Sequence, residues 1–195
     1  MKRDIILAGV GGQGIISIAS VIGFTALQQG LFMKQSEVHG MSQRGGNVQS
    51  NLRISDKEIA SDLIPLGKAD LIISVEPLES LRYLPGLSKD GWVITSTTPY
   101  INIPDYPSID DILREIKSLP HYIALDADSI AKDAGSVKAA NIVILGASSP
   151  FLDMAFQQIE DAIRFIFRKK GEDITIINLK ALKAGRDFTE RNRTN

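Results

Sequence analysis

Two segments of this sequence carry residues that could bind an anion or take part in catalysis. The first is GVGGQGI near the N-terminus, in which Gly9, Gly11 and Gly14 fit the spacing G-x-G-x-x-G. Glycines at this spacing let a strand turn into a helix whose first N–H groups attract phosphate. Gly12 and Gln13 complete the segment, and the Gln13 amide can donate to a phosphate or to a second chain. We expect a backbone cradle that faces an anion or a partner.

The second segment is SEVHGMSQRGGNVQS, in which polar residues and glycines follow an apolar run. This composition predicts a loop at the carboxyl end of a strand, where ligands bind in open α/β sheets. Its candidate site residues are Glu37, His39, Ser42, Gln43, Arg44, Gly45 and Gly46. His39 and Arg44 are the catalytic candidates: Arg44 suits an anion clamp, and His39 suits either proton transfer or a structural hydrogen bond. A loop that only turns the chain is the alternative.

The rest of the sequence must supply the elements that position these segments. Apolar runs that end at glycine, proline or polar clusters predict strands at residues 4–10, 31–36, 47–55, 69–77 and 88–97, and one beginning at His121. Apolar residues at three- and four-residue spacing predict helices at residues 12–29, 78–84, 108–118 and 151–171, and one ending at Gly135. Residues 137–149 fit a buried strand or a buried helix, and their alanines favour the helix.

Alternating strands and helices predict an α/β fold, a Rossmann-like three-layer domain with a mainly parallel sheet and helices on both faces. The first two strands should run parallel, joined by a right-handed crossover. Residues 1–185 are expected to form one domain and residues 186–195 a flexible tail.

Composition excludes several classes of site. The chain has no cysteine, so it cannot hold an iron–sulfur cluster through thiolates, and its two histidines, His39 and His121, are too far apart to suggest zinc. No metal site is expected. A net charge of -1 gives no attraction to nucleic acid or to an anionic membrane, and no apolar run reaches the ~20 residues of a membrane span. We expect a cytoplasmic protein.

An NAD site would place an acidic side chain after the second strand, about 20 residues beyond the glycines. Lys34, Gln35 and Ser36 occupy that stretch, and Glu37 is expected in the following loop. An NAD(P) dehydrogenase is therefore disfavoured, although Lys34 could accept the 2′-phosphate of NADP. A freestanding module that binds coenzyme A or a nucleotide is a further alternative.

The segments GVGGQGI and SEVHGMSQRGG together resemble the small subunit of indolepyruvate ferredoxin oxidoreductase, and more broadly the gamma subunit or domain of 2-oxoacid:ferredoxin oxidoreductases. The resemblance continues in order along nearly the whole chain, in SDLIPLGKADLIISVEPLESLRYLPGL, GWVITST, ALDADSIA, AANIVILGA and NLKALKAG. The form EVHGMSQRGG resembles the indolepyruvate branch more than the pyruvate or 2-oxoglutarate branches.

This resemblance implies that the chain belongs to a complex that converts an aryl pyruvate and coenzyme A into an aryl-acetyl-CoA and carbon dioxide, with ferredoxin as the electron acceptor. It further implies that a large partner subunit holds thiamine diphosphate, magnesium and the iron–sulfur clusters. The present chain would bind no cofactor alone, would shape the site beside the partner and could receive coenzyme A as substrate. An apolar surface left exposed could let the isolated chain form a homodimer.

Overall fold

A six-stranded sheet with the strand order β2-β3-β1-β4-β5-β6 forms the middle layer of the computed structural model, which describes residues 1–40 and 45–193. Its strands are β1 (Lys2–Val10), β2 (Phe32–His39), β3 (Asn47–Ser55), β4 (Ala69–Ser74), β5 (Leu87–Ser96) and β6 (Tyr122–Leu125). The pairs β1–β4, β4–β5 and β5–β6 are parallel. β3 is antiparallel to both of its neighbours, β1 and β2. The expected α/β class with a mostly parallel sheet is confirmed.

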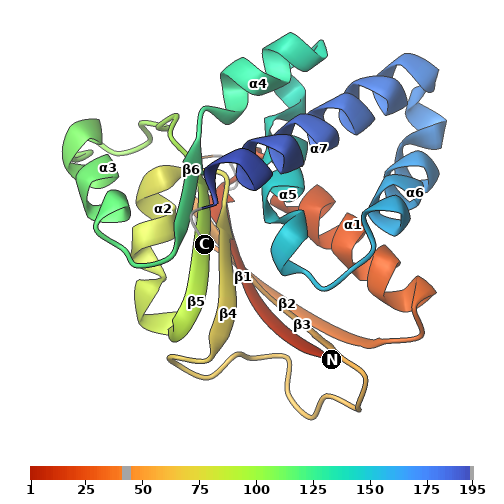
Figure 1. Ribbon diagram of the computed structural model, residues 1–195. Coiled ribbons are helices and arrows are strands. Elements are labelled where there is room, and N and C mark those ends of the chain that lie inside the picture. The colour runs from red at the N-terminus through yellow and green to blue at the C-terminus, as the bar shows by residue number, and fades with distance from the viewer. Residues whose placement is uncertain (41–44, 194–195) are drawn as a thin grey trace.

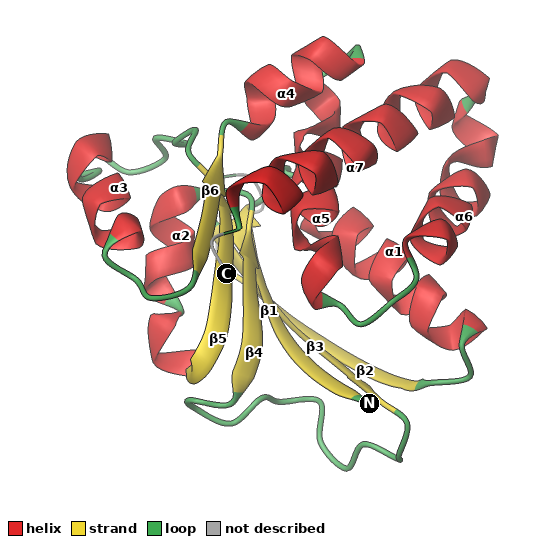
Figure 2. Cartoon of the chain, in the orientation of Figure 1, coloured by secondary structure: helices red, strands yellow, loops and turns green. Residues whose placement is uncertain are grey.

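Helices cover both faces of this sheet (Figures 1 and 2). They are α1 (Ile15–Gln28), α2 (Pro77–Arg82), α3 (Ile109–Lys117), α4 (Ala127–Ala134), α5 (Ala140–Ser148), α6 (Phe156–Phe167) and α7 (Glu172–Asn192). The larger apolar core lies between the sheet and the layer of α1, α5, α6 and α7, and a smaller one, built on Ile6, Ile72 and Val93, faces α2. None of the described helices has the length and apolarity that a membrane span requires.

The first two strands run in the same direction, as expected, but they do not pair with each other. Both pair antiparallel with β3, so they run in the same direction with β3 between them. β3 follows β2 closely in sequence and pairs with it as the second strand of a hairpin. The apolar face of β3, which includes Leu52 and Ile54, is then buried beneath α1.

Helix α5 confirms the helical interpretation of residues 137–149, and every residue of α5 is buried. Helix α7 packs along it, with a stripe of mostly small or polar buried residues at helical spacing: Asn178, Ala181, Leu182, Gly185 and Thr189. The tail expected from residue 186 is therefore wrong as far as Asn192. Residues 186–192 continue α7, and the buried Thr189 hydroxyl donates to the Ala147 carbonyl at 2.9 Å.

Candidate functional site

The glycine segment forms a tight turn between β1 and α1. Gly9 lies within β1 opposite Val48 rather than in the turn that we expected it to make. The turn is closed by Gln13, whose N–H donates to the Val10 carbonyl at 3.1 Å and whose Oε1 accepts from the Val10 N–H at 2.8 Å. The Gln13 side chain thus stabilises the turn through its oxygen, while its NH₂ group makes no hydrogen bond to the described residues.

The turn contacts the second candidate segment directly. The Gly11 N–H donates to the Gly46 carbonyl at 2.9 Å and extends the β1–β3 ladder. On the other side of the hairpin, Asn102 Nδ2 donates to the Gly45 carbonyl at 2.6 Å. The structure thus brings Gly11 together with Gly45 and Gly46 of the second segment. The candidates Ser42, Gln43 and Arg44 lie outside the described residues.

Glu37 and His39 lie in β2 rather than in the expected loop. They stand two residues apart on one face, and His39 Nε2 is 2.5 Å from Glu37 Oε1. His39 pairs with Val48, which pairs with Gly9, so two strand spacings of about 4.8 Å, or roughly 10 Å, separate His39 from β1. The other oxygen of Glu37 is buried without a hydrogen-bond partner among the described residues. These two residues form a separate polar pair beside the glycine turn.

A pocket of about 360 Å³ opens on the opposite side of the turn. Two helices begin there: α1 after Gly14, which adopts a left-handed conformation (φ 81°), and α5 after Ala139. Asn141 Nδ2 donates to the Gly14 carbonyl at 3.0 Å and ties the two helix ends together. The residues that line the pocket are Gly12, Gln13, Gly14, Ser17, Ser136, Lys138, Ala139, Asn141, Phe167, Lys170, Ile174, Ile177 and Asn178.

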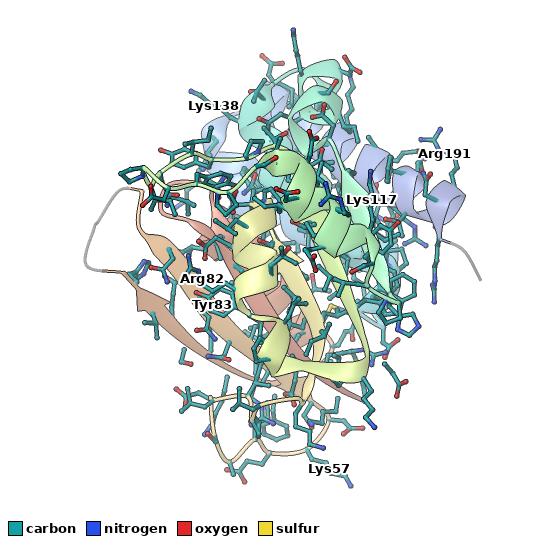
Figure 3. All side chains as sticks on the ribbon, turned by 90° about the vertical axis from the view of Figure 1, so that its left-hand side faces the viewer. Lys57, Arg82, Tyr83, Lys117, Lys138 and Arg191 are labelled. Carbon is teal, nitrogen blue, oxygen red and sulfur yellow. The ribbon has the colours of Figure 1, made fainter. Side chains whose placement is uncertain are left out.

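The electrostatics of this pocket favour an anion. Lys138 and Lys170 are its charged residues, and no carboxylate is among the lining residues. The start of α1 has no side-chain N-cap, so its first amides are open to an acceptor, whereas α5 continues from a 3-10 turn (Val137–Ala139) that is capped by the Ser136 hydroxyl. In Figure 3 Lys138 lies at the end of the molecule opposite Lys57. The N-terminus of α1 and the two lysines can together bind a phosphate or pyrophosphate.

The strand order argues against a dinucleotide in this pocket. A Rossmann NAD site takes its ribose-binding carboxylate from the strand adjacent to the glycine turn. Here that neighbour is the antiparallel β3, whose Asn47 and Val48 lie beside the turn, and β2 with Lys34 is one strand further away. Neither position that the NAD and NADP alternatives need is next to the pocket.

A buried carboxylate at the N-cap of α2 organises the neighbouring edge of the sheet. Glu76 is 1% exposed and accepts hydrogen bonds from the Glu79 N–H at 2.8 Å, from the Tyr100 N–H at 3.3 Å and from the Tyr106 hydroxyl. Burial and then the hydrogen bond to Glu76 raise the pKa of Tyr106 above its usual range. Glu76 thus anchors the segment that carries Asn102, and through it the hairpin at Gly45.

The described residues offer little redox or metal chemistry of their own. They contain no group of three or more histidine, aspartate or glutamate side chains that could hold a metal ion, and the chain has no cysteine. What the arrangement can do chemically is bind an anion and present a polar edge to another molecule.

Comparisons with known proteins identify the family and the fold of the chain. A family model described as pyruvate ferredoxin/flavodoxin oxidoreductase matches residues 4–188. The chain is 39% identical to the indolepyruvate oxidoreductase subunit IorB of Archaeoglobus fulgidus, over 95% of this chain and 94% of that protein. The gamma subunit of a keto/oxoacid ferredoxin oxidoreductase from Geobacter sulfurreducens superimposes with a TM-score of 0.70 at 25% identity, covering 97% of this chain and 99% of that one.

A longer chain contains the same fold. The 2-oxoglutarate:ferredoxin oxidoreductase of Magnetococcus marinus, solved with 2-oxoglutarate, coenzyme A and succinyl-CoA bound, superimposes with a TM-score of 0.76 at 20% identity. The match covers 97% of this chain and 31% of that chain.

Proposed function

The chain belongs to the pyruvate ferredoxin/flavodoxin oxidoreductase family, and we propose that it is the small subunit of a cytoplasmic indolepyruvate ferredoxin oxidoreductase complex. Such a complex converts an aryl pyruvate and coenzyme A into an aryl-acetyl-CoA and carbon dioxide and passes the electrons to ferredoxin. The observation that carries this proposal is the near full-length similarity to an indolepyruvate oxidoreductase subunit, at 39% identity.

The residues of this chain do not fit the cofactors of the reaction. A cysteine-free chain offers no thiolate to an iron–sulfur cluster, and the described residues hold no carboxylate cluster for the magnesium of thiamine diphosphate. We assign these groups to a large partner subunit. The small subunit would shape and cover the site beside that partner.

The proposed contribution of this chain is to bind the phosphates of coenzyme A. Lys138, Lys170 and the uncapped start of α1 after Gly14 supply positive charge and N–H donors without a competing carboxylate. The polar edge formed by Glu37, His39, Ser42, Gln43, Arg44, Gly45 and Gly46 would face the partner. In this arrangement the glycine turn binds a substrate and leaves the chemistry to the partner's cofactors.

Purification of the tagged chain from native extract tests the complex. We expect it to copurify with a large, cysteine-rich chain that contains thiamine and iron, and the pair to reduce ferredoxin with indolepyruvate and coenzyme A. Recovery of the chain alone, with coenzyme A bound in calorimetry, would support the freestanding module instead. Turnover of a substrate by the isolated chain with NAD(P)H would overturn the proposal.

Two variants of the assembled complex test the site residues. Lys138→Gln combined with Lys170→Gln should raise KM for coenzyme A by about tenfold or more, because each charged contact to phosphate contributes on the order of 1 kcal/mol. The matched control is Lys57→Gln with Lys89→Gln, which removes two exposed lysines that do not line this pocket. Arg44→Ala should lower turnover with assembly intact, and unchanged kinetics would remove Arg44 from the site.

A further inference from the structure

The last strand of the sheet has one unpaired edge. β6 pairs with β5, and among the described residues no strand follows it. The Val93 N–H donates to the His121 carbonyl at 3.1 Å and the Thr97 N–H to the Leu125 carbonyl at 2.9 Å, so alternate residues from His121 to Leu125 face β5. Tyr122 and Ala124 therefore direct their N–H and C=O groups outward, where they make no hydrogen bond to the described residues.

A groove of about 580 Å³ runs along this edge. Leu113 and Lys117 of α3 line one wall, and Phe188 and Asn192 of α7 line the other. In Figure 3 the helix that carries Lys117 and the end of α7 lie on the same side of the molecule. The groove is thus lined by residues of two helices and by the open edge of β6.

The groove is cationic and contains an unsatisfied polar atom. Lys117 is its charged lining residue, Arg193 lies over the rings of Trp92 and Phe151 nearby, and no carboxylate is among the lining residues. His121 stacks on Trp92 with ring centroids 5.1 Å apart, and its Nδ1 is buried without a hydrogen-bond partner among the described residues. Buried polar atoms normally have a partner, so this one favours a bound polar group.

The two edges of the sheet differ in the side chains that proteins use to prevent strand addition. β2, at the opposite edge, carries Lys34, Glu37 and His39, and charged residues of this kind discourage pairing. The sequence YIAL of β6 has neither a charge nor a proline. An extended peptide could hydrogen-bond to Tyr122 and Ala124 while its side chains enter the groove, the mode by which open sheet edges recruit partner segments.

We infer that β6 accepts an extended segment of the large partner subunit as a seventh strand, and that this segment carries acidic side chains that pair with Lys117 and Arg193. The inference rests on the proposed function, because the occupant belongs to that subunit. Charge complementarity and main-chain hydrogen bonding identify the occupant as an acidic, extended peptide.

Hydrogen exchange at single amides, compared between the dilute isolated chain and the assembled complex, tests the inference. We expect the amides of Tyr122 and Ala124 to exchange freely in the isolated chain and about 100-fold more slowly in the complex. The amides of Ile123 and Leu125, which face β5, are internal references and should be protected in both states. Slowing of the Tyr122 and Ala124 amides in the isolated chain as its concentration rises would identify a second copy as the occupant and overturn the inference.

A charge reversal provides an independent measurement. Lys117→Glu should weaken assembly by about tenfold and by less at high salt, because it places a carboxylate opposite the acidic segment. Lys57→Glu is the matched control and should leave assembly unchanged. Assembly with unslowed amides at Tyr122 and Ala124 would overturn this inference alone, whereas failure to assemble with any thiamine-binding chain would overturn the proposed function and this inference with it.

Discussion

Asn141 at the start of α5 donates from its side-chain amide to the carbonyl of Gly14, the N-cap of α1, at 3.0 Å. A single hydrogen bond thus joins two helix N-termini that are 127 residues apart in sequence. Both helices direct their positive ends toward the same pocket. The shape of this pocket, the proposed phosphate site, therefore depends on how closely these two residues approach.

Gly14→Ala tests this close approach. The new Cβ would lie 2.5 Å from Asn141 Nδ2, and the left-handed backbone (φ 81°) adds strain. We expect a loss of about 2–4 kcal/mol in the free energy of unfolding, measured with denaturant, because a left-handed residue alone costs about 1–2 kcal/mol. Asn141→Ala removes the clashing amide, so the double variant should lose less than the sum of the two single losses. Strict additivity would show that the two residues do not constrain each other.

The contact between α5 and α7 depends on two further glycines. A Cβ on Gly146 would lie 2.0 Å from the Leu182 carbonyl oxygen, and one on Gly185 would lie 2.0 Å from that of Val143. Backbone atoms cannot move aside as a side chain can, so either substitution by alanine must separate the helices. Each should cost more than about 3 kcal/mol in the free energy of unfolding.

The matched control for these variants is Gly30→Ala. Gly30 has a positive φ (70°), unlike Gly146 and Gly185, but no atom lies within 4 Å of the position that a Cβ would take there, so only backbone strain of about 1–2 kcal/mol is expected. Equal losses at Gly30 and Gly146 would contradict the role assigned to close helix packing.

The composition of its buried stripe, which includes Gly185, explains why α7 was not predicted from the sequence. A helix is usually identified by a stripe of large apolar residues, but the buried stripe of α7 includes Asn178, Ala181, Gly185 and Thr189. Residues 137–149 were assigned correctly because alanines flank a continuous apolar run. The insertion of β3 between β1 and β2 was missed because local periodicity predicts a strand but not its neighbours.

The candidate site was predictable only where local spacing determines it. The turn at Gly11–Gly14 and its contact with Gly46 follow from two glycine segments at one sheet edge. Asn141, Lys138 and Lys170 were missed because tertiary packing brings them to the turn across more than 100 residues. Glu37 was predicted to lie in a loop because a run of polar residues begins there. The structure instead places it in β2, which continues to His39.

Tyr106→Phe tests the Glu76 anchor through its pH dependence. At neutral pH the loss of a hydrogen bond to a buried carboxylate should cost about 1.5–3 kcal/mol in the free energy of unfolding. The pKa of Tyr106 is raised in the folded state. The Tyr106 hydroxyl therefore contributes fully to the free energy of unfolding below the unfolded-state pKa near 10. This contribution is lost at higher pH, because the phenol of the unfolded chain then ionises.

The stability difference between wild type and Tyr106→Phe should therefore shrink as the pH rises above about 10. Tyr100→Phe is the matched control, since the Glu76 carboxylate accepts from the backbone N–H of Tyr100 rather than from its hydroxyl. A difference that stays constant up to about pH 11 would contradict the raised pKa.

Arg53→Lys tests how the loop at residues 56–68 is held. The Arg53 guanidinium donates to both carboxylate oxygens of Asp4, at 2.7 and 3.1 Å, and to the carbonyls of Ser61 and Leu63, both at 3.0 Å. Asp4 is 1% exposed. An ammonium group cannot reproduce this planar set of four bonds, so the variant should lose about 1–3 kcal/mol in the free energy of unfolding.

The loop should also open locally, and limited proteolysis within residues 56–68 should be faster in Arg53→Lys at temperatures where both proteins remain folded. Arg114→Lys changes an exposed pair with Asp111 and should alter stability by less than about 0.5 kcal/mol. If Arg53→Lys behaved like Arg114→Lys in both measurements, the buried ion pair would not hold this loop. We expect the larger loss for Arg53→Lys because Asp4 is buried and its carboxylate depends on the Arg53 hydrogen bonds in place of water. The exposed Asp111 carboxylate can be hydrated by solvent when its pair with Arg114 changes.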